Sequence, residues 1–167
     1  MHDDFPELMQ SVEVVAAAEL GGKDKFSTLG YYSDQERTVA LNRNYTDIGK
    51  MNSVYDEAVR SGYHPARGDK TGTEAVTLHE MGHALTGYVQ KKMGSSSFDA
   101  AAQRIVRAAY NASNGKGGTL AWAGNISGYA QQNYAECIAE AVCDHYCNGS
   151  RAAAESRAIM SILRRYK

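Results

Sequence analysis

Residues 79–83, which read HEMGH, constrain the fold of this chain more than any other stretch. Positions four apart on an α-helix lie on nearly the same face, because one turn takes about 3.6 residues. His79 and His83 therefore point the same way if the stretch is helical, and together they can hold one metal ion. Glu80 leans toward the same side, where a carboxylate can take a proton from a metal-bound water.

The H-E-x-x-H pattern is typical of zinc hydrolases, but three fixed positions also arise by chance. The assignment therefore needs a helical setting, a third ligand and a substrate surface. Apolar residues at helical spacing from Ala75 to Val89 predict a helix with Thr73 as its N-cap and an end near Gly94. Inside it, Gly82 costs about 1 kcal/mol relative to alanine, but a glycine lets another element approach closely.

The third ligand distinguishes the classes of zinc peptidase. One class has a glycine and a third histidine three and six residues after the second histidine. In this chain Thr86 and Val89 occupy those positions, so that class is excluded. A glutamate from a later helix is the other common solution.

Two glutamates four residues apart, Glu136 and Glu140, lie in the largely apolar stretch 134–142. On a helix they share one face, so one can bind the metal while the other orients a ligand imidazole. Paired carboxylates on an apolar helix are costly to bury without partners. This cost favours a metal site over a solvated acidic stripe.

Several further side chains fit a ligand role less well. His145 lies about half a turn out of phase with Glu136, so we expect it to face away. His64 precedes a proline in a loop that can approach the cleft, but we expect a surface histidine. The two cysteines that share the Glu136 face, Cys143 and Cys147, are expected to be small buried hydrophobic residues rather than metal ligands.

Three short segments carry a resemblance to a known family: residues 126–130 (ISGYA), 133–136 (NYAE) and 139–141 (AEA). They look like the second signature of the gluzincin peptidases typified by the catalytic domain of anthrax lethal factor, a type also seen in phage-encoded proteins. The similarity runs from residue 77 to about residue 146. The chain departs from the family pattern at Thr86, where relatives often carry an acid, and after the ligand glutamate, where relatives tend to have aromatic residues.

The resemblance implies a zinc-dependent endopeptidase with peptide or protein substrates. It implies the following roles: zinc ligands His79, His83 and Glu136, general base Glu80, oxyanion donor Tyr129, and Glu140 as the partner of the ligands. In such an enzyme a metal-activated water attacks the peptide carbonyl after Glu80 takes its proton. The alternative is a phage structural or toxin-associated module that retains zinc without significant turnover.

The remaining pattern predicts a single zincin-like domain over residues 1–167, α+β and mainly helical, with the motif helix packed on the helix that bears Glu136. Periodicity predicts helices over residues 5–20, 46–61, 73–94, 98–110, about 133–147, and from a Ser150 cap onward. Aromatic and β-branched residues predict strands within residues 30–45, around a turn near Ser33. We expect residues 38–42 to form the edge that holds an extended peptide, and residues 111–128 to form a glycine-rich loop.

Composition narrows the partners and the compartment. The 18 basic residues nearly balance the 19 acidic ones, so nucleic acid and anionic membranes are not expected partners. The start of the chain shows no signal peptide pattern. The three cysteines, all within residues 137–147, favour a reducing compartment. A glycan at the Asn125 sequon would crowd the site, so we expect a source in which this asparagine is not glycosylated: a bacterium, a phage or a cytosol. The chain can be part of a longer polypeptide or of a phage assembly.

Overall fold

The computed structural model describes residues 1–18 and 28–167. In these ranges the fold is α+β and mainly helical, as predicted. The helices are α1 (Pro6–Ser11), α2 (Ile48–Arg60), α3 (Gly72–Met93), α4 (Phe98–Ala112), α5 (Thr119–Ala123), α6 (Tyr134–Asn148) and α7 (Ala154–Leu163). The strands are β1 (Glu13–Ala18), β2 (Gly30–Ser33) and β3 (Thr38–Asn42).

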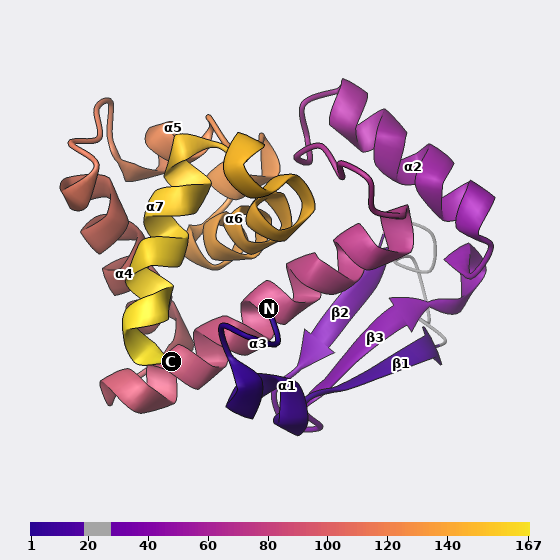
Figure 1. Ribbon diagram of the computed structural model, residues 1–167, viewed down its shortest axis with the longest axis horizontal. Helices are drawn as coiled ribbons and strands as arrows, with labels where there is room; N and C mark the ends of the chain where they lie inside the picture. Colours follow the sequence, from indigo (N-terminus) through magenta and orange to yellow (C-terminus); the bar gives the residue numbers. More distant parts are fainter. Residues whose placement is uncertain (19–27) are drawn as a thin grey trace.

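Helix α3 lies between the sheet on one side and α4 to α7 on the other (Figure 1). A capping box starts it: the Thr71 side chain accepts a hydrogen bond from the Glu74 N–H at 3.1 Å, and the Glu74 carboxylate accepts one from the Thr71 N–H at 2.8 Å. The prediction of Thr73 as the cap is therefore wrong by two residues, because only Thr71 has a glutamate three positions later. The helix ends at Met93, close to the predicted end near Gly94, and Gly94 adopts the left-handed conformation that terminates it.

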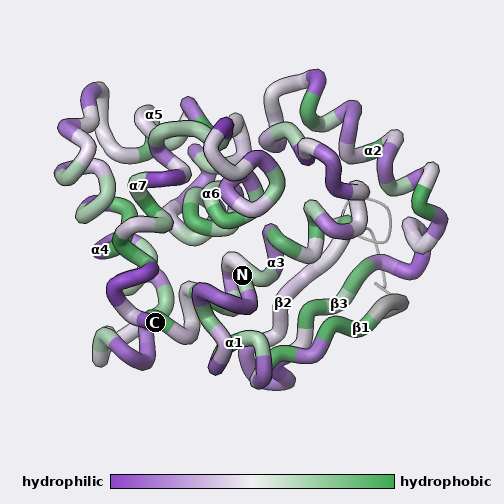
Figure 2. Tube along the Cα trace, viewed as in Figure 1, coloured by the Kyte–Doolittle hydropathy of each residue, from purple (hydrophilic) through white to green (hydrophobic). Residues whose placement is uncertain are grey.

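Helices α3 and α6 cross closely at Gly82. A Cβ atom there would lie 2.5 Å from the Ala139 Cα of α6, so only glycine permits this packing. The predicted close approach of another element is confirmed. The main core surrounds this crossing and includes Leu85, Ile138 and Leu163. Apolar stretches of α3, α6 and β3 stand out in Figure 2.

The three-stranded sheet has the order β1-β3-β2. Strand β1 pairs with β3 in parallel, and β2 pairs with β3 in antiparallel register. The predicted edge strand at residues 38–42 is therefore wrong, because β3 is central. Strand β2 packs on α3 and forms the edge nearest the motif, and Gly30 lets it lie close, since a Cβ there would be 2.9 Å from Val76 Cγ1.

The helix predicted over residues 5–20 is wrong in its second half. Only α1 is helical, and the backbone becomes extended at Val12 and continues as β1. Pairing with β3 outweighs the local apolar spacing, and Val14 and Val15 are β-branched residues that suit a strand. The predicted end of that helix, at residues 19–22, lies outside the described residues.

The C-terminal helices follow the prediction except in two places. The predicted loop 111–128 contains the short helix α5. Ser150 does not cap the last helix, which begins at Ala154. Instead, Asp144 of α6 accepts hydrogen bonds from the Ala153 N–H at 2.8 Å and from the Ser156 hydroxyl at 2.6 Å. A carboxylate from another helix thus takes the place of a local cap.

Among the described residues, no helix combines the length and the hydrophobicity that a membrane span requires.

Candidate metal centre

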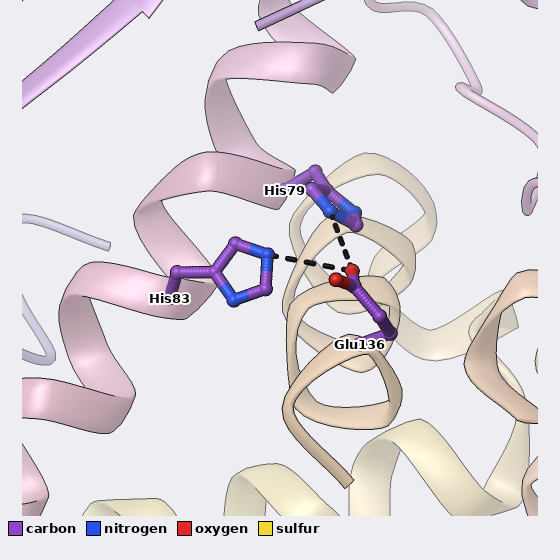
Figure 3. Close-up of side chains that lie close together, drawn as sticks. All are labelled: His79, His83 and Glu136. Carbon is purple, nitrogen blue, oxygen red and sulfur yellow. Dashed lines mark ion pairs between the residues drawn. The ribbon is translucent and has the colours of Figure 1, made fainter. Parts of the chain in front are cut away.

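Three side chains predicted as ligands meet where α3 and α6 face each other (Figure 3). Glu136 Oε2 lies 3.2 Å from His79 Nε2 and 3.4 Å from His83 Nε2. One ligand atom from each residue lies within 4.8 Å of the others, and no other group of three in residues 1–18 and 28–167 has this potential to hold a metal. Asn133 caps α6 by accepting a hydrogen bond from the Glu136 N–H at 2.9 Å, so Glu136 is placed by the first turn of its helix.

One buried oxygen of Glu136 lacks a hydrogen-bond partner, and a metal ion would take that place. Glu136 Oε2 is buried and has no hydrogen-bond partner of acceptable geometry, although both imidazoles are near. A buried carboxylate oxygen without a partner is costly. A cation shared by this oxygen and the two Nε2 atoms would satisfy all three. Two imidazoles and one carboxylate are the protein ligands of one class of catalytic zinc site.

Glu140 lies behind His79, one turn after Glu136 on α6. Its side chain is 0% exposed. Oε1 accepts a hydrogen bond from His79 Nδ1 at 2.7 Å, and Oε2 accepts one from the Ser127 hydroxyl at 2.7 Å. In the neutral ring that binds a metal, a hydrogen bond at Nδ1 leaves the lone pair of His79 on Nε2, the nitrogen that faces the proposed metal position.

The pKa shifts of these groups follow from the contacts between the carboxylates and the imidazoles. Burial alone would lower the pKa of His79, but Glu136 and Glu140 outweigh it and raise that pKa to about 10. Burial alone would raise the pKa of Glu136, but His79 and His83 hold it well below its usual range. For Glu140, hydrogen bonds from His64 and His79 outweigh burial and lower the pKa to about 2. The two glutamates are thus carboxylates at neutral pH, in the form that binds or orients a cation.

Glu80, the predicted general base, is 7% exposed and faces β2. Burial raises the pKa of its carboxyl group, while the nearby His79 and His83 and a backbone hydrogen bond with Tyr32 oppose this rise. A raised pKa suits a carboxyl group that takes up a proton and returns it at neutral pH.

Tyr129, the predicted oxyanion donor, lies against His79 with ring centroids 5.7 Å apart and planes 19° apart. Its backbone is fixed to the loop after α2: the Tyr129 N–H donates to Tyr63 O at 3.0 Å, and the Gly128 N–H donates to Gly62 O at 2.8 Å. Burial raises the pKa of the Tyr129 hydroxyl above its ordinary value. The hydroxyl therefore keeps its proton at neutral pH and can donate a hydrogen bond.

Two cavities meet at this centre. The first, of about 270 Å³, extends toward α2 and is lined by His64, Tyr55 and Val54 among others. The second, of about 420 Å³, contains His83 and Glu136. Both are lined by Gly30, His79, Glu80 and Tyr129. The two cavities therefore adjoin at Glu80 and Tyr129, which form part of the wall of both.

His64 is predicted from the sequence to be a surface residue, and that prediction is wrong. Its side chain is 15% exposed, and its Nδ1 lies 3.0 Å from Glu140 Oε1. This contact joins positions 76 residues apart in the sequence. No spacing rule covers such a pair, and the only local sign is a histidine between Tyr63 and Pro65 in the loop after α2.

His145 and the cysteine pair lie away from the centre. His145 Nε2 is 3.0 Å from an Arg164 nitrogen, so His145 faces away as predicted. Cys143 is fully buried and its sulfur lies 4.0 Å from that of Cys147. No third ligand joins these two cysteines among the described residues.

Comparisons of the chain with models of known families, with curated proteins and with solved structures found no match.

Proposed function

We propose that this chain is a zinc-dependent endopeptidase of the gluzincin type, with zinc held by His79, His83 and Glu136. The observation that carries the proposal is the convergence of these three ligand atoms within 4.8 Å around a buried carboxylate oxygen that lacks a hydrogen-bond partner. When bound, zinc supplies Lewis acidity, which polarises a carbonyl and makes a water molecule easier to deprotonate.

Glu80 is the proton carrier in this proposal. It accepts the proton of the attacking water and returns it to the amine that leaves after the peptide bond breaks. Its burial and raised pKa support this role, and its place on the wall of both cavities supports contact with a passing substrate.

Tyr129 stabilises the oxyanion. Its hydroxyl donates a hydrogen bond to the negative charge that develops on the former carbonyl oxygen. Comparable donors contribute about 3 kcal/mol in other enzymes. The backbone hydrogen bonds that hold this residue, and its place on the wall of both cavities, support the role.

Strand β2 provides the surface for an extended peptide. It pairs with β3 on one side, and no other described strand pairs with it. Gly30, Tyr31 and Tyr32 also line the second cavity, beside the proposed ligands. Backbone hydrogen bonds to such an edge hold peptides in many complexes.

The alternative is a module that keeps zinc without turnover. Structural zinc sites usually have four protein ligands, whereas three protein ligands beside open cavities are typical of catalytic sites. The arrangement of His79, His83 and Glu136 beside two cavities therefore favours the enzyme.

Glu80→Gln separates the two functions, because it removes the proton acceptor and leaves the proposed ligands in place. We expect both proteins to bind about one zinc per chain by elemental analysis. In a peptide library followed by mass spectrometry, the zinc-loaded variant is expected to cleave at least about a thousandfold more slowly than the wild type. Equal inactivity of the two zinc-loaded proteins would refute the enzyme proposal, and absence of zinc from both would refute the metal site.

A further inference from the structure

His64 forms part of the wall of the first cavity, and the roles proposed for the metal centre do not include it. Tyr55 stacks on its ring, with centroids 5.4 Å apart and planes 7° apart. The Nδ1 atom of His64 lies 3.0 Å from Oε1 of Glu140 and forms a hydrogen bond with it. The Tyr55 hydroxyl also donates to Pro65 O at 3.3 Å, which anchors the next residue of the loop. The orientation of the His64 ring is therefore fixed.

The tautomer of His64 follows from the acceptor that it shares with His79. Glu140 Oε1 lies 2.7 Å from His79 Nδ1 and 3.0 Å from His64 Nδ1. A carboxylate oxygen only accepts hydrogen bonds, so both Nδ1 atoms carry a hydrogen. A neutral His64 ring then has its lone pair on Nε2. That nitrogen has no hydrogen-bond partner among the described residues and is not buried, so it is free to accept a hydrogen bond from a ligand.

The position of His64 relative to the reacting groups is equally defined. The ring centroids of His64, His79 and Tyr129 form a triangle with sides of 6.1, 5.4 and 5.7 Å. His64 lines the first cavity with Glu80 and Tyr129, whereas Glu136 lines only the second cavity. A peptide whose carbonyl lies over Glu80 and Tyr129 therefore passes His64 as it extends into the first cavity.

We propose that His64 is a substrate-binding residue whose Nε2 accepts a hydrogen bond from a backbone N–H of the peptide in the first cavity. This inference rests on the proposed function and adds a second contact to the peptide backbone. A peptide presents donors and acceptors in alternation, so Tyr129 serves a carbonyl oxygen while His64 serves an N–H group on the same side of the scissile bond. Together they set the register of the peptide over Glu80.

Ester substitution in the substrate tests this contact directly. Replacing one non-scissile N–H by oxygen removes the donor and keeps the shape of the backbone. For one position beside the scissile bond, we expect the kcat/KM of the wild type to fall about tenfold, the effect of one hydrogen bond. His64→Asn keeps a donor for Glu140 but removes Nε2. This variant is expected to cleave the all-amide peptide about tenfold more slowly than the wild type does. Its kcat/KM for the ester peptide is expected to equal its kcat/KM for the amide peptide.

Two controls accompany this measurement. His145→Asn makes the same change at a histidine that contacts Arg164 away from the cavities, and it is expected to cleave like the wild type. The zinc content of His64→Asn is expected to equal that of the wild type. His64→Gln, which restores an acceptor near the Nε2 position, is expected to recover sensitivity to the ester.

Two results would overturn the inference: an ester effect of the same size in the wild type and in His64→Asn, or no ester effect at any position in the wild type. If His64→Asn does not fold, as judged by circular dichroism, the ester scan of His64→Phe takes its place, because phenylalanine keeps the ring and has no acceptor. If the zinc-loaded wild type cleaves no peptide, the proposed function fails. In that case, calorimetric binding of amide and ester peptides to the wild type and to His64→Asn still tests His64: we expect about a tenfold difference in Kd between the peptides for the wild type and no difference for the variant.

Discussion

Glu140 joins three separate segments of the chain around the candidate metal centre. It is completely buried, and its two oxygens receive hydrogen bonds from His79, His64 and Ser127. These three partners come from α3, from the loop after α2 and from the loop before α6. A buried carboxylate is tolerated because all three partners satisfy it. In return, it fixes the orientation of His79 and of the cavity wall.

Replacing Glu140 by glutamine should weaken the metal site without removing a ligand. A neutral amide oxygen is a poorer acceptor than a carboxylate, so His79 would be a less basic and less well oriented ligand. We expect zinc affinity to fall between about tenfold and a hundredfold, measured by competition with a chromogenic chelator. The control is Glu155→Gln, at a partly exposed glutamate that accepts a hydrogen bond from Asn125. Unchanged affinity in Glu140→Gln would show that His79 does not need this partner.

At the scale of elements, the contact between α3 and α6 determines whether the ligands meet. His79 and His83 belong to one helix and Glu136 to the other, so their separation depends on how closely the helices approach. That approach is closest at Gly82, one residue before His83, opposite Ala139. The glycine lowers the intrinsic stability of α3, and the close packing of two helices that carry the site offsets this cost.

Gly82→Ala should therefore destabilise the protein although alanine favours helices. The added Cβ would lie 2.5 Å from Ala139 Cα, so the helices must separate. We expect a loss of about 2 kcal/mol in the free energy of unfolding in urea, together with weaker zinc binding. Gly87→Ala is the matched control in the same helix, because its Cβ would meet only the movable end of Asp34 at 3.3 Å and Phe98 at 4.0 Å. That variant is expected to be neutral or more stable by up to about 1 kcal/mol, and equal losses in both variants would contradict the packing explanation.

At the scale of the whole molecule, Asp4 connects the two ends of the chain. Its Oδ1 accepts a hydrogen bond from Arg164 Nε at 3.0 Å, and its Oδ2 accepts hydrogen bonds from another Arg164 nitrogen at 2.8 Å and from the Tyr146 hydroxyl at 2.7 Å. The first residues are thereby held against α6 and against the end of the chain after α7. The hydrogen bond from Arg164 is the main reason that the pKa of Asp4 falls from 3.8 to about 2.

This shift predicts a pH-dependent contribution to stability. A carboxyl group with a lowered pKa in the folded state stabilises the protein above its unfolded pKa and loses this effect as the pH falls through the folded value. The contribution of Asp4 should be complete above about pH 4 and disappear between about pH 4 and pH 2. Asp4→Asn is expected to reduce the free energy of unfolding by about 1 kcal/mol at pH 7, with the difference shrinking toward zero near pH 2. Denaturant unfolding of both proteins at several pH values measures this, and a difference that stays constant with pH would contradict it.

Local periodicity determined much of this protein by itself. The spacing of His79 and His83, of Glu136 and Glu140, and of the apolar residues around them predicted two helices with these side chains on one face of each. Such predictions depend only on the geometry of a single helix, so they need no knowledge of distant residues. The ends of α3 are also set by local signals, Thr71 with Glu74 at the start and Gly94 at the end, although the predicted cap, Thr73, lies two residues too late.

The tertiary structure alone decided three other features. The strand β1 replaced a predicted helix because its hydrogen bonds come from β3, a strand that lies more than 20 residues later. The same pairing put β3 in the centre of the sheet and left β2 as the edge beside the candidate metal centre. His64 joined the centre through a carboxylate 76 residues away. In each case the deciding partner is distant in sequence, and its position depends on how the helices and the sheet pack together.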